Sequence, residues 1–567
     1  MLAGATVLFG VLLSALGPSV ESDSYEWQRT RAVLEAEGLQ VDRAPDGKRI
    51  AWIRVVRDQV FVDGELFPTW LNVFHARTRE RVVRRELLFA DGDAYDHDRI
   101  EESMRNLRGM AIFAQVRIVA VQTEQPDAVG VLVHTRDLWS LRFETAFNLS
   151  SQINSVDLAL VERNLAGFGH YGGLGFALRP DTFSISETYN VRRLLGGSLR
   201  LVERGGVIFN RERVTPEGGF GQINFGRPFY RIAQRSSFGL VAGYSARVRR
   251  QLSNGVPLSW TPSDTTDPAG LRIWNQRLFN SEASYSVRRG QRTRHTVGVV
   301  WFFNAQHFAP NAETGISPAL HAAFRNDVLP PERRETGPGL RYRLFVPSFR
   351  TYTNLDTFGQ SENVRLGPDV DVAVSAPLTL VGSYKEARIV SAALGWTWAL
   401  GDGLLTARGS ARGRYQDATW LDQRLEASIR GATPMLGFLR LVARARLALR
   451  HNDTAKTLVT LGSEDGLRGY PADHLTGYGA HLLNVNVELR TRALSWRGVL
   501  LGAVAFYDAG AVFTSIPQAQ LRHGVGVGLR LLLPQLNRTP WVADAGFATQ
   551  PLGFVPTVRS ALVMSVD

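Results

Sequence analysis

The sequence contains no cysteine. Without thiols, the chain has no disulfide framework, no thiolate metal site, no cysteine nucleophile and no lipidated cysteine. It also lacks the local signatures of common enzymes: no G-x-S-x-G, no H-E-x-x-H and no phosphate-binding P-loop occurs, and the 11 histidines show no ligand spacing. We therefore expect a protein that is not an enzyme and that holds neither a metal nor a cofactor.

Charged residues are sparse, at 21% of the chain, yet the net charge is +12. A basic excess points to an anionic partner, either nucleic acid or a membrane surface, and the position of the charges decides between them. The 54 glycines and 29 phenylalanines argue against disorder and provide ample material for large sheets.

The first 20 residues, "MLAGATVLFGVLLSALGPSV", carry no charge and are followed by "ESDS". This pattern favours a signal peptide over residues 1–22, with cleavage among the small residues near Gly17–Ser22. The alternative is a single membrane-anchor helix, because ~20 apolar residues can span a bilayer. No later window reaches that length without a charge, so we expect no further transmembrane helix.

Residues 50–137 mix helical and strand periodicity. Ile100, Met104 and Leu107 recur at i, i+4 and i+7, which is one face of a helix. Strand-like segments lie before and after it, in "RIAWIRVVRDQVFV", "FAQVRIVAVQ" and "VGVLVHTRD". The order β-α-α-β-β predicts a small α+β domain. Residues 23–49 are interpreted as a lead-in segment or a partial second module.

From residue 138 to 567 the helical signal disappears and apolar residues alternate with polar ones. In "RLVARARLALR" one face is entirely apolar and the other carries three arginines. A soluble sandwich and a transmembrane barrel both produce this pattern. The length of the region favours the barrel, and ~10 residues per spanning strand, plus turns and alternately long loops, give about 14–18 strands. The basic residues then line the lumen or loops, and we expect no nucleic acid partner.

The stretch "GFGHYG", residues 167–172, formally matches the dinucleotide fingerprint G-x-G-x-x-G. That fingerprint requires a strand, a turn and then a helix whose N-terminus receives the pyrophosphate. Here the next residues, "GLGFALRP", are strand-like. The glycines are therefore interpreted as sites of kinking and close packing in a barrel strand.

A single arginine, Arg468, lies in the loop "GLRGYP" between two alternating regions. In the downstream segment "LGAVAFYDAGAVF", parity places Phe506, Asp508 and Gly510 on one face, opposite a face of small and aromatic residues that suits lipid. The same parity turns Glu488 inward. Two inward carboxylates are costly unless a cation meets them. Arg468 could be that cation, or lumenal arginines such as Arg490 and Arg530 could take its place.

Five segments together resemble the BamA-type outer-membrane assembly superfamily, which includes TamA and the two-partner secretion transporters. They cover about residues 50–567 and occur in the family's order. "GLRGYP", with Leu467, Arg468, Gly469 and Tyr470, resembles its V-R-G-F/Y loop, and "FYDAG", with Phe506, Asp508 and Gly510, its F-x-D-x-G strand. The others are "ERNLAGFG", "GVGVGLRLLLP" and, for the periplasmic POTRA module, "ADGDAYDHDRIEESMRNLRGMAIFAQVRI".

The resemblance implies a POTRA domain at 50–137 in the periplasm and a 16-stranded surface-antigen barrel at 138–567 in the bacterial outer membrane. It also implies that the loop enters the lumen, where Arg468 contacts Asp508 and Glu488. The implied function is insertion or translocation of client polypeptides, with outer-membrane lipids and accessory periplasmic or lipoprotein subunits as further partners. Three alternatives stay open: a two-partner-secretion-type pore, a structural barrel without a client and, as the least favoured, a lipase-like barrel that assembles its residues from distant strands. Essential assembly proteins of this kind carry several POTRA modules, whereas one is evident here.

Overall fold

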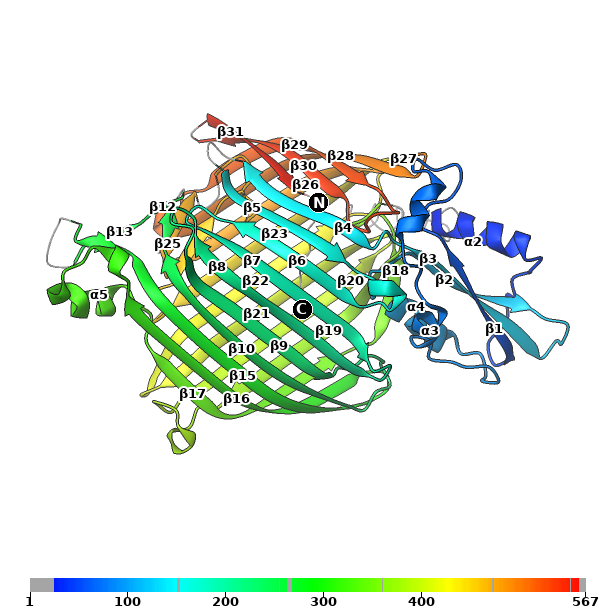
Figure 1. The fold of residues 1–567 in the computed structure, drawn as a ribbon, viewed down its shortest axis with the longest axis horizontal. Helices are drawn as coiled ribbons and strands as arrows, with labels where there is room; N and C mark the ends of the chain where they lie inside the picture. Colours follow the sequence, from blue (N-terminus) through cyan, green and yellow to red (C-terminus); the bar gives the residue numbers. More distant parts are fainter. Residues whose placement is uncertain are drawn as a thin grey trace, which may run out of the picture.

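The computed structural model describes residues 25–149, 153–253, 255–262, 268–358, 360–463, 465–471, 474–550 and 552–559. The expected signal peptide at 1–22 lies outside these residues. Among the described residues no helix is both long and apolar enough to cross a membrane. The chain forms a small α+β unit and a large closed barrel, and the unit lies at one end of the barrel (Figure 1).

The α+β unit is built on a three-stranded mixed sheet. The strand order is β1 (Arg49–Asp58), β3 (Ala128–Asp137), β2 (Phe113–Gln122), with β1 parallel and β2 antiparallel to β3. Helices α3 (Glu80–Arg84) and α4 (His97–Arg108) lie between β1 and β2 in the chain, so the β-α-α-β-β order is the one that the periodicity predicts.

Helix α4 shows why this segment folds as it does. Its N-cap is Asp96, whose carboxylate accepts hydrogen bonds from two backbone N–H groups of the first turn. Ile100, Met104 and Leu107 are buried against the sheet, as their spacing predicts. The segment therefore has both a start signal and one apolar face to bury.

Residues preceding β1 complete the same unit. Helix α2 (Tyr25–Ala36) packs on the opposite face of the sheet, where Leu34 contacts a cluster that includes Val121 and Leu132. The backbone N–H of Asp42 donates to the carbonyl of Ala120 at 2.9 Å. The sheet is thus covered on both faces, and the described part of 23–49 is a helical lead-in that packs on this sheet.

The barrel wall closes on itself through antiparallel pairing, with β4 next to β31 (Figure 1). Its strands are β4 (Leu141–Leu149), β5 (Ile153–Glu162), β6 (Tyr171–Leu178), β7 (Thr182–Leu194), β8 (Leu199–Asn210), β9 (Pro216–Arg227), β10 (Ser236–Arg250), β15 (Ile273–Arg289), β16 (Arg294–Pro310), β17 (Arg333–Phe345), β18 (Ser348–Tyr352), β19 (Glu362–Ser375), β20 (Arg388–Leu400), β21 (Gly403–Gln416), β22 (Thr419–Ala432), β23 (Leu439–His451), β26 (His481–Thr491), β27 (Leu494–Trp496), β28 (Val499–Phe513), β29 (Arg522–Leu532), β30 (Trp541–Thr549) and β31 (Leu552–Arg559).

The expectation of 16 strands is wrong. Of the 22 segments in the described wall, β17 and β18 pair one after the other with β19, and β26 and β27 do the same with β28, which leaves 20 strands around the barrel. Alternately long loops were assumed, but many connections are short at both ends, as between Leu400 and Gly403 or Gln416 and Thr419. More of the chain is therefore available for strands.

Side chains alternate between the two faces of the wall. On β28, Leu501 and Tyr507 are exposed, whereas Phe506 and Asp508 are buried. A closed barrel directs alternate residues outward and into the lumen. The exposed apolar face is therefore the outer wall and Asp508 faces the lumen. The neighbouring strand β29 exposes a matching row: Val525, Val527 and Leu529.

Polar contacts join the α+β unit to the barrel. Arg193 on β7 makes two hydrogen bonds of 2.7 Å to the buried carboxylate of Glu86. At the β5–β6 turn, Asn164 donates to the Thr78 hydroxyl at 2.9 Å, and the Arg79 backbone N–H donates to Gly167. These contacts hold the unit against the mouth of the barrel.

The opposite end of the barrel carries a small cap built from two loops. Short strands β11 (Leu252–Ser253), β12 (Val256–Pro257), β13 (Ser259–Trp260) and β14 (Gly270–Leu271) meet η4 (Ala312–Thr314), η5 (Pro318–Leu320) and α5 (His321–Asp327) (Figure 1). Their core includes Trp260 and Phe324, whose rings meet edge to face.

Candidate functional site: the arginine loop in the barrel lumen

The loop that carries Arg468 folds back into the barrel. It connects β24 (Leu458–Leu461) and β25 (Leu475–Tyr478), which pair with each other. Leu467 and Tyr470 are fully buried, in a cluster with residues of β23, β26 and β30. The Tyr470 hydroxyl donates to the carbonyls of His523 and Gln550 at 3.0 and 3.2 Å. Apolar packing and a hydrogen bond thus fix the loop on both sides of Arg468.

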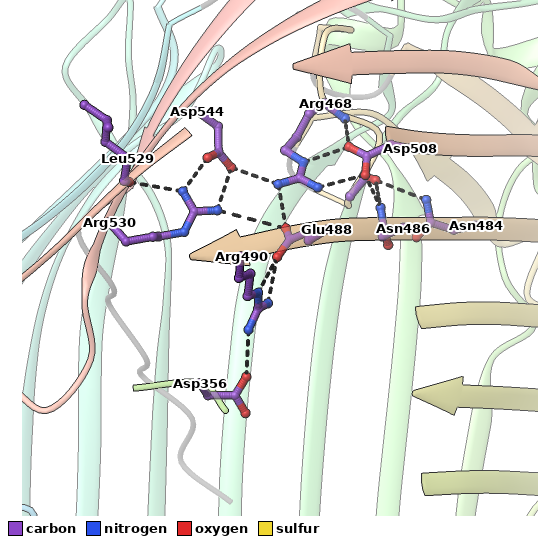
Figure 2. A network of polar contacts seen from close by, with 11 residues as sticks. Asp356, Arg468, Asn484, Asn486, Glu488, Arg490, Asp508, Leu529, Arg530 and Asp544 are labelled. Atoms are coloured by element: carbon purple, nitrogen blue, oxygen red, sulfur yellow. Dashed lines mark hydrogen bonds and ion pairs between the residues drawn. The ribbon is translucent and has the colours of Figure 1, made fainter. Parts of the chain in front are cut away.

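Arg468 donates three hydrogen bonds to the carboxylate of Asp508 (Figure 2). Its Nε and Nη2 atoms donate to the two carboxylate oxygens at 2.7 and 2.8 Å, and its backbone N–H donates to Oδ2 at 3.1 Å. The planar guanidinium matches the carboxylate in a bidentate pair, which a lysine could not reproduce. Asp508 is fully buried, so this contact is shielded from solvent.

The remaining guanidinium nitrogen reaches two more acids. Nη1 of Arg468 donates to Glu488 Oε1 at 2.8 Å and to Asp544 Oδ2 at 3.0 Å. These acids lie on β26 and β30, on either side of the β28 and β29 pair. One arginine therefore ties the loop to the inner faces of three strands.

The sequence offers either Arg468 or the lumenal arginines Arg490 and Arg530 as partners for the inward carboxylates. The structure contains both. Glu488 also accepts from Arg490 at 2.7–2.8 Å, and Arg530 pairs with Asp544. The cluster thus holds three arginines and four carboxylates, the fourth being Asp356, which lies 3.5 Å from Arg490. The near balance of positive and negative side chains reduces the cost of burying charge, because each carboxylate has a cation partner.

Phe506 and Gly510 of the "FYDAG" strand flank Asp508 and shape the pocket for the loop. The Arg468 guanidinium lies 3.6 Å above the centre of the Phe506 ring, a cation–π contact. A Cβ atom at Gly510 would lie 2.5 Å from the Leu461 side chain. The aromatic residue supports the cation, and the glycine leaves room for the strand that leads into the loop.

Glycines allow the loop and the wall to touch backbone to backbone. Gly469 has φ +95°, and a Cβ there would lie 2.7 Å from the backbone carbon of Phe547. A Cβ on Gly546 would lie 2.5 Å from the Gly469 nitrogen, and one on Gly524 would lie 2.1 Å from the Arg468 carbonyl oxygen. Side chains at these positions would push the loop off the wall.

Two parts of the site are not in the sequence interpretation. Asp544 is the third acid, and its signal is the alternation of "WVADAGF", which places it on the lumenal face of β30. Two of the "GFGHYG" glycines, Gly167 and Gly169, lie at the β5–β6 turn and approach the α+β unit, whereas Gly172 lies in strand β6. In the same turn Phe168 is covered by the guanidinium groups of Arg79 and Arg81 at 3.9 and 4.8 Å.

The ion pairs of Arg468 with Asp508, Glu488 and Asp544 hold the loop against the wall, and we call this set of contacts the clamp. Within the described parts of the chain, no group of three or more histidine, aspartate or glutamate side chains is arranged to hold a metal ion. The carboxylates are occupied by arginine donors. The arrangement fixes a loop in the lumen.

The sequence of the chain has a curated relative. The outer membrane protein assembly factor BamA of Nitratidesulfovibrio vulgaris is 29% identical over 120 residues. The resemblance to BamA-type proteins is confirmed. The matched stretch spans 20% of this chain and 14% of that relative, and no model of a known protein family matches the chain.

Two solved structures also align with most of this chain. BamA from Haemophilus ducreyi lacking POTRA domains 1–3 aligns with 96% of this chain and 94% of its own length, at 12% identity and a TM-score of 0.36. CdiB from Escherichia coli aligns with 90% of this chain and 76% of its own length, at 11% identity and a TM-score of 0.42.

Proposed function

We propose that this protein inserts or exports client polypeptides at the bacterial outer membrane. The observation that carries the proposal is the lumenal loop, clamped by Arg468 to Asp508, Glu488 and Asp544 inside a closed barrel. A clamp made of ion pairs holds the loop firmly yet separates without covalent chemistry. The loop motif and the "FYDAG" strand, which carry the resemblance to BamA-type proteins, meet in space at this clamp.

Residues 138–567 form the membrane-spanning part in this proposal. The described wall has an even number of strands and an apolar outer face, both of which suit a bacterial outer-membrane barrel. Exposed tryptophans on several strands fit the aromatic girdles of such barrels. These are Trp301, Trp396, Trp398, Trp420, Trp496 and Trp541. Outer-membrane lipids are then the first partner.

Residues 50–137 act as a POTRA domain in the periplasm. Strand β1 lies at one edge of the sheet, and from Arg54 to Asp58 no other described strand pairs with its outer side. An extended client segment could add to this edge by main-chain hydrogen bonding, which makes little demand on its sequence. Accessory periplasmic or lipoprotein subunits would bind the same exposed α+β unit.

The seam between β31 and β4 is the proposed place where a client strand enters the wall. Three residue pairs join these strands in the described residues, from Asn148–Thr557 to Ala146–Arg559. This pairing joins the first and last strands of the wall and is the one that closes the barrel.

A polypeptide-translocating pore of the two-partner-secretion type is the second candidate. The 20 strands favour it, because barrels of 16–18 strands already leave an aqueous channel. In that case the Arg468 loop is the plug, and its release opens the lumen. A structural barrel without a client would use the clamp for rigidity alone.

Depletion of the protein, followed by quantitative proteomics of the outer membrane and of the culture medium, tests these functions. Insertion predicts loss of outer-membrane proteins, and export predicts loss of secreted ones. Re-expression of the wild type should restore the profile, Arg468→Ala should not, and Arg289→Ala should, because Arg289 is exposed and far from the clamp. Normal outer-membrane and secreted profiles after depletion would refute both functions.

A further inference from the structure

A long connection separates β1 from α3. It runs from Gln59 to Arg79, whereas connections in compact domains are mostly about 4–6 residues and long ordered ones usually have a function. It contains the 3₁₀ helix η2 (Thr69–Phe74). The β-α-α-β-β arrangement of the unit makes no use of so long a connection.

Helix η2 presents an apolar surface to the outside. None of its side chains is buried, and Trp70, Val73 and Phe74 are 63%, 84% and 69% exposed. The Trp70 and Phe74 rings touch edge to face, with centroids 6.4 Å apart. Three large apolar side chains clustered on one turn and covered by no described residue indicate an interaction site.

The exposure of η2 is built into the fold. The Asn72 side chain accepts from the Phe61 N–H at 3.0 Å and donates to the Phe61 carbonyl at 2.8 Å. The Phe61 ring packs on Phe67 and Trp139 at centroid distances of 5.2 and 5.4 Å. The helix is held on its inner side, and its apolar side chains are left on the outer side.

The connection is attached to the rim of the barrel. The backbone N–H of Leu66 donates to the carbonyl of Arg497, in the turn between β27 and β28, at 3.0 Å. Glu65 accepts from Gln535 at 2.9 Å and from Arg136 at 2.6 Å. In Figure 1 this blue segment lies next to β27. The same rim exposes Leu494 and Trp496, by 75% and 59%.

We propose that Trp70, Val73 and Phe74 insert into the periplasmic leaflet of the outer membrane, at the boundary between phospholipid headgroups and acyl chains. This inference rests on the proposed membrane position of the barrel. Trp and other amphipathic aromatic residues concentrate at that boundary, and short apolar faces bind there in proportion to the area they bury. The hydrogen bond from Leu66 to Arg497 places the connection that carries η2 beside the turn next to Leu494 and Trp496, so both apolar surfaces lie at the same rim, which favours lipid over a protein partner.

The anchor gives the α+β unit two attachments with different chemistry. Arg193 and Glu86 form a polar attachment to β7, and η2 forms a lipid attachment near β27 and β28. With both in place, the unit stays below the barrel mouth and cannot swing away from the rim. Loss of the lipid attachment leaves the polar contacts intact.

Single-cysteine labelling tests the anchor, because the chain has no cysteine of its own. The full-length protein carries a nitroxide at Val73→Cys, at Leu494→Cys on the rim, or at Glu35→Cys on the exposed surface of α2. It is reconstituted in vesicles of phosphatidylethanolamine and phosphatidylglycerol. Power-saturation EPR then compares the accessibility of each label to oxygen, which partitions into lipid, and to Ni(II)-EDDA, which stays in water.

The expected result is that oxygen accessibility exceeds that of Ni(II)-EDDA at positions 73 and 494, and that the order reverses at position 35. Trp70→Glu/Phe74→Glu should reverse the order at position 73 and leave position 494 unchanged. Dominant Ni(II)-EDDA accessibility at 73, or low accessibility to both reagents, would overturn the anchor. So would an unchanged signal in the double variant. A normal proteome after depletion refutes the proposed function without altering these signals.

Discussion

Arg468 and Arg250 are two arginine hubs at different places in the molecule. Each contacts three carboxylates: Arg468 binds Asp508, Glu488 and Asp544, and Arg250 binds Glu217, Glu313 and Asp181. Arg250 donates to Glu217 at 2.7 and 2.9 Å and to Glu313 at 2.8 and 3.1 Å. The same chemistry thus appears at both sites.

The two hubs differ in what they hold. The acids of Arg468 come from three wall strands, and the arginine comes from the loop that joins β24 to β25. Arg250 ends strand β10, and its acids come from the start of β9, the β6–β7 turn and the loop after β16. The Arg468 hub therefore fixes a loop against the wall, whereas the Arg250 hub ties two strand ends, a turn and a loop to each other at the capped end. Burial of the carboxylates differs in the same way, since Asp508 is fully buried and the Glu313 side chain is 27% exposed.

The largest effect is expected for Asp508→Ala, which leaves Arg468 in a buried site without its main partner. Breaking one partner of a buried pair costs about 3–5 kcal/mol. Heat-modifiability on gels and urea unfolding of the refolded barrel measure the loss. Asp508→Asn keeps the shape but not the charge and should be nearly as damaging. Wild-type unfolding of both variants would mean that the lumenal clamp does not hold the loop.

A smaller loss is expected for Gly546→Ala, because the added methyl group meets the backbone of Gly469. Overpacking of this kind costs about 1–3 kcal/mol. Gly221→Ala on β9 is the matched control, since a Cβ there meets nothing within 4 Å. Protease cleavage in 462–474 should rise in the first variant and stay at the wild-type level in the second. Equal protection in both would refute the close approach of loop and wall.

Replacing each hub arginine by lysine sharpens the comparison. Each change loses a bidentate pair, Arg468 with Asp508 and Arg250 with Glu217, but only Arg468→Lys also loses the stacking on Phe506. A hydrogen bond to a charged group contributes about 1.5–3 kcal/mol, so Arg468→Lys should lose a few kcal/mol and Arg250→Lys less. Urea unfolding midpoints of the two variants measure this order. The reverse order would show that the capped end, and not the lumenal loop, controls barrel stability.

The smallest effect concerns pH at the capped end. Burial acts to raise the pKa of Glu313, but hydrogen bonds from Arg213 and Arg250 outweigh it, and the pKa is lowered below its ordinary value. A carboxyl with a lowered pKa stabilises the fold above its unfolded pKa, and that contribution is lost as the pH falls through the lowered value. Amide exchange of residues 311–329, corrected for the intrinsic rate, should therefore increase below about pH 4. Glu313→Gln should remove this pH dependence, and a wild-type dependence in that variant would exclude Glu313 as its source.

The sequence predicts the Arg468 hub and not the Arg250 hub, for a physical reason. Asp508 and Glu488 lie in strands with strict alternation, and parity alone turns them to the inner face. Arg250 also ends an alternating strand, but Glu313 and Asp181 lie in loops, where no period fixes the direction of a side chain. The third acid of the clamp, Asp544, was within reach of the same parity argument.

The number of strands shows a similar limit. Alternation identifies a barrel but does not reveal how much of the chain is spent in turns. The resemblance implied 16 strands, and short connections at both ends give 20 in the described wall. Helix α4 was predictable because its cap and its apolar face are local. The connection that carries η2 was not, because its apolar residues have no period and are held by contacts with Trp139 and Arg497.

By itself the sequence determined what depends on neighbours along the chain: the alternation of the wall, the apolar face of α4, and the two inward carboxylates that require a cation. The tertiary structure alone decided the features that depend on closure of the barrel wall. Closing the wall brings β30 beside the loop and adds Asp544 to the clamp, sets the circumference, and places η2 at the rim. These outcomes join residues far apart in the chain, and no local period specifies which distant strand a loop will meet.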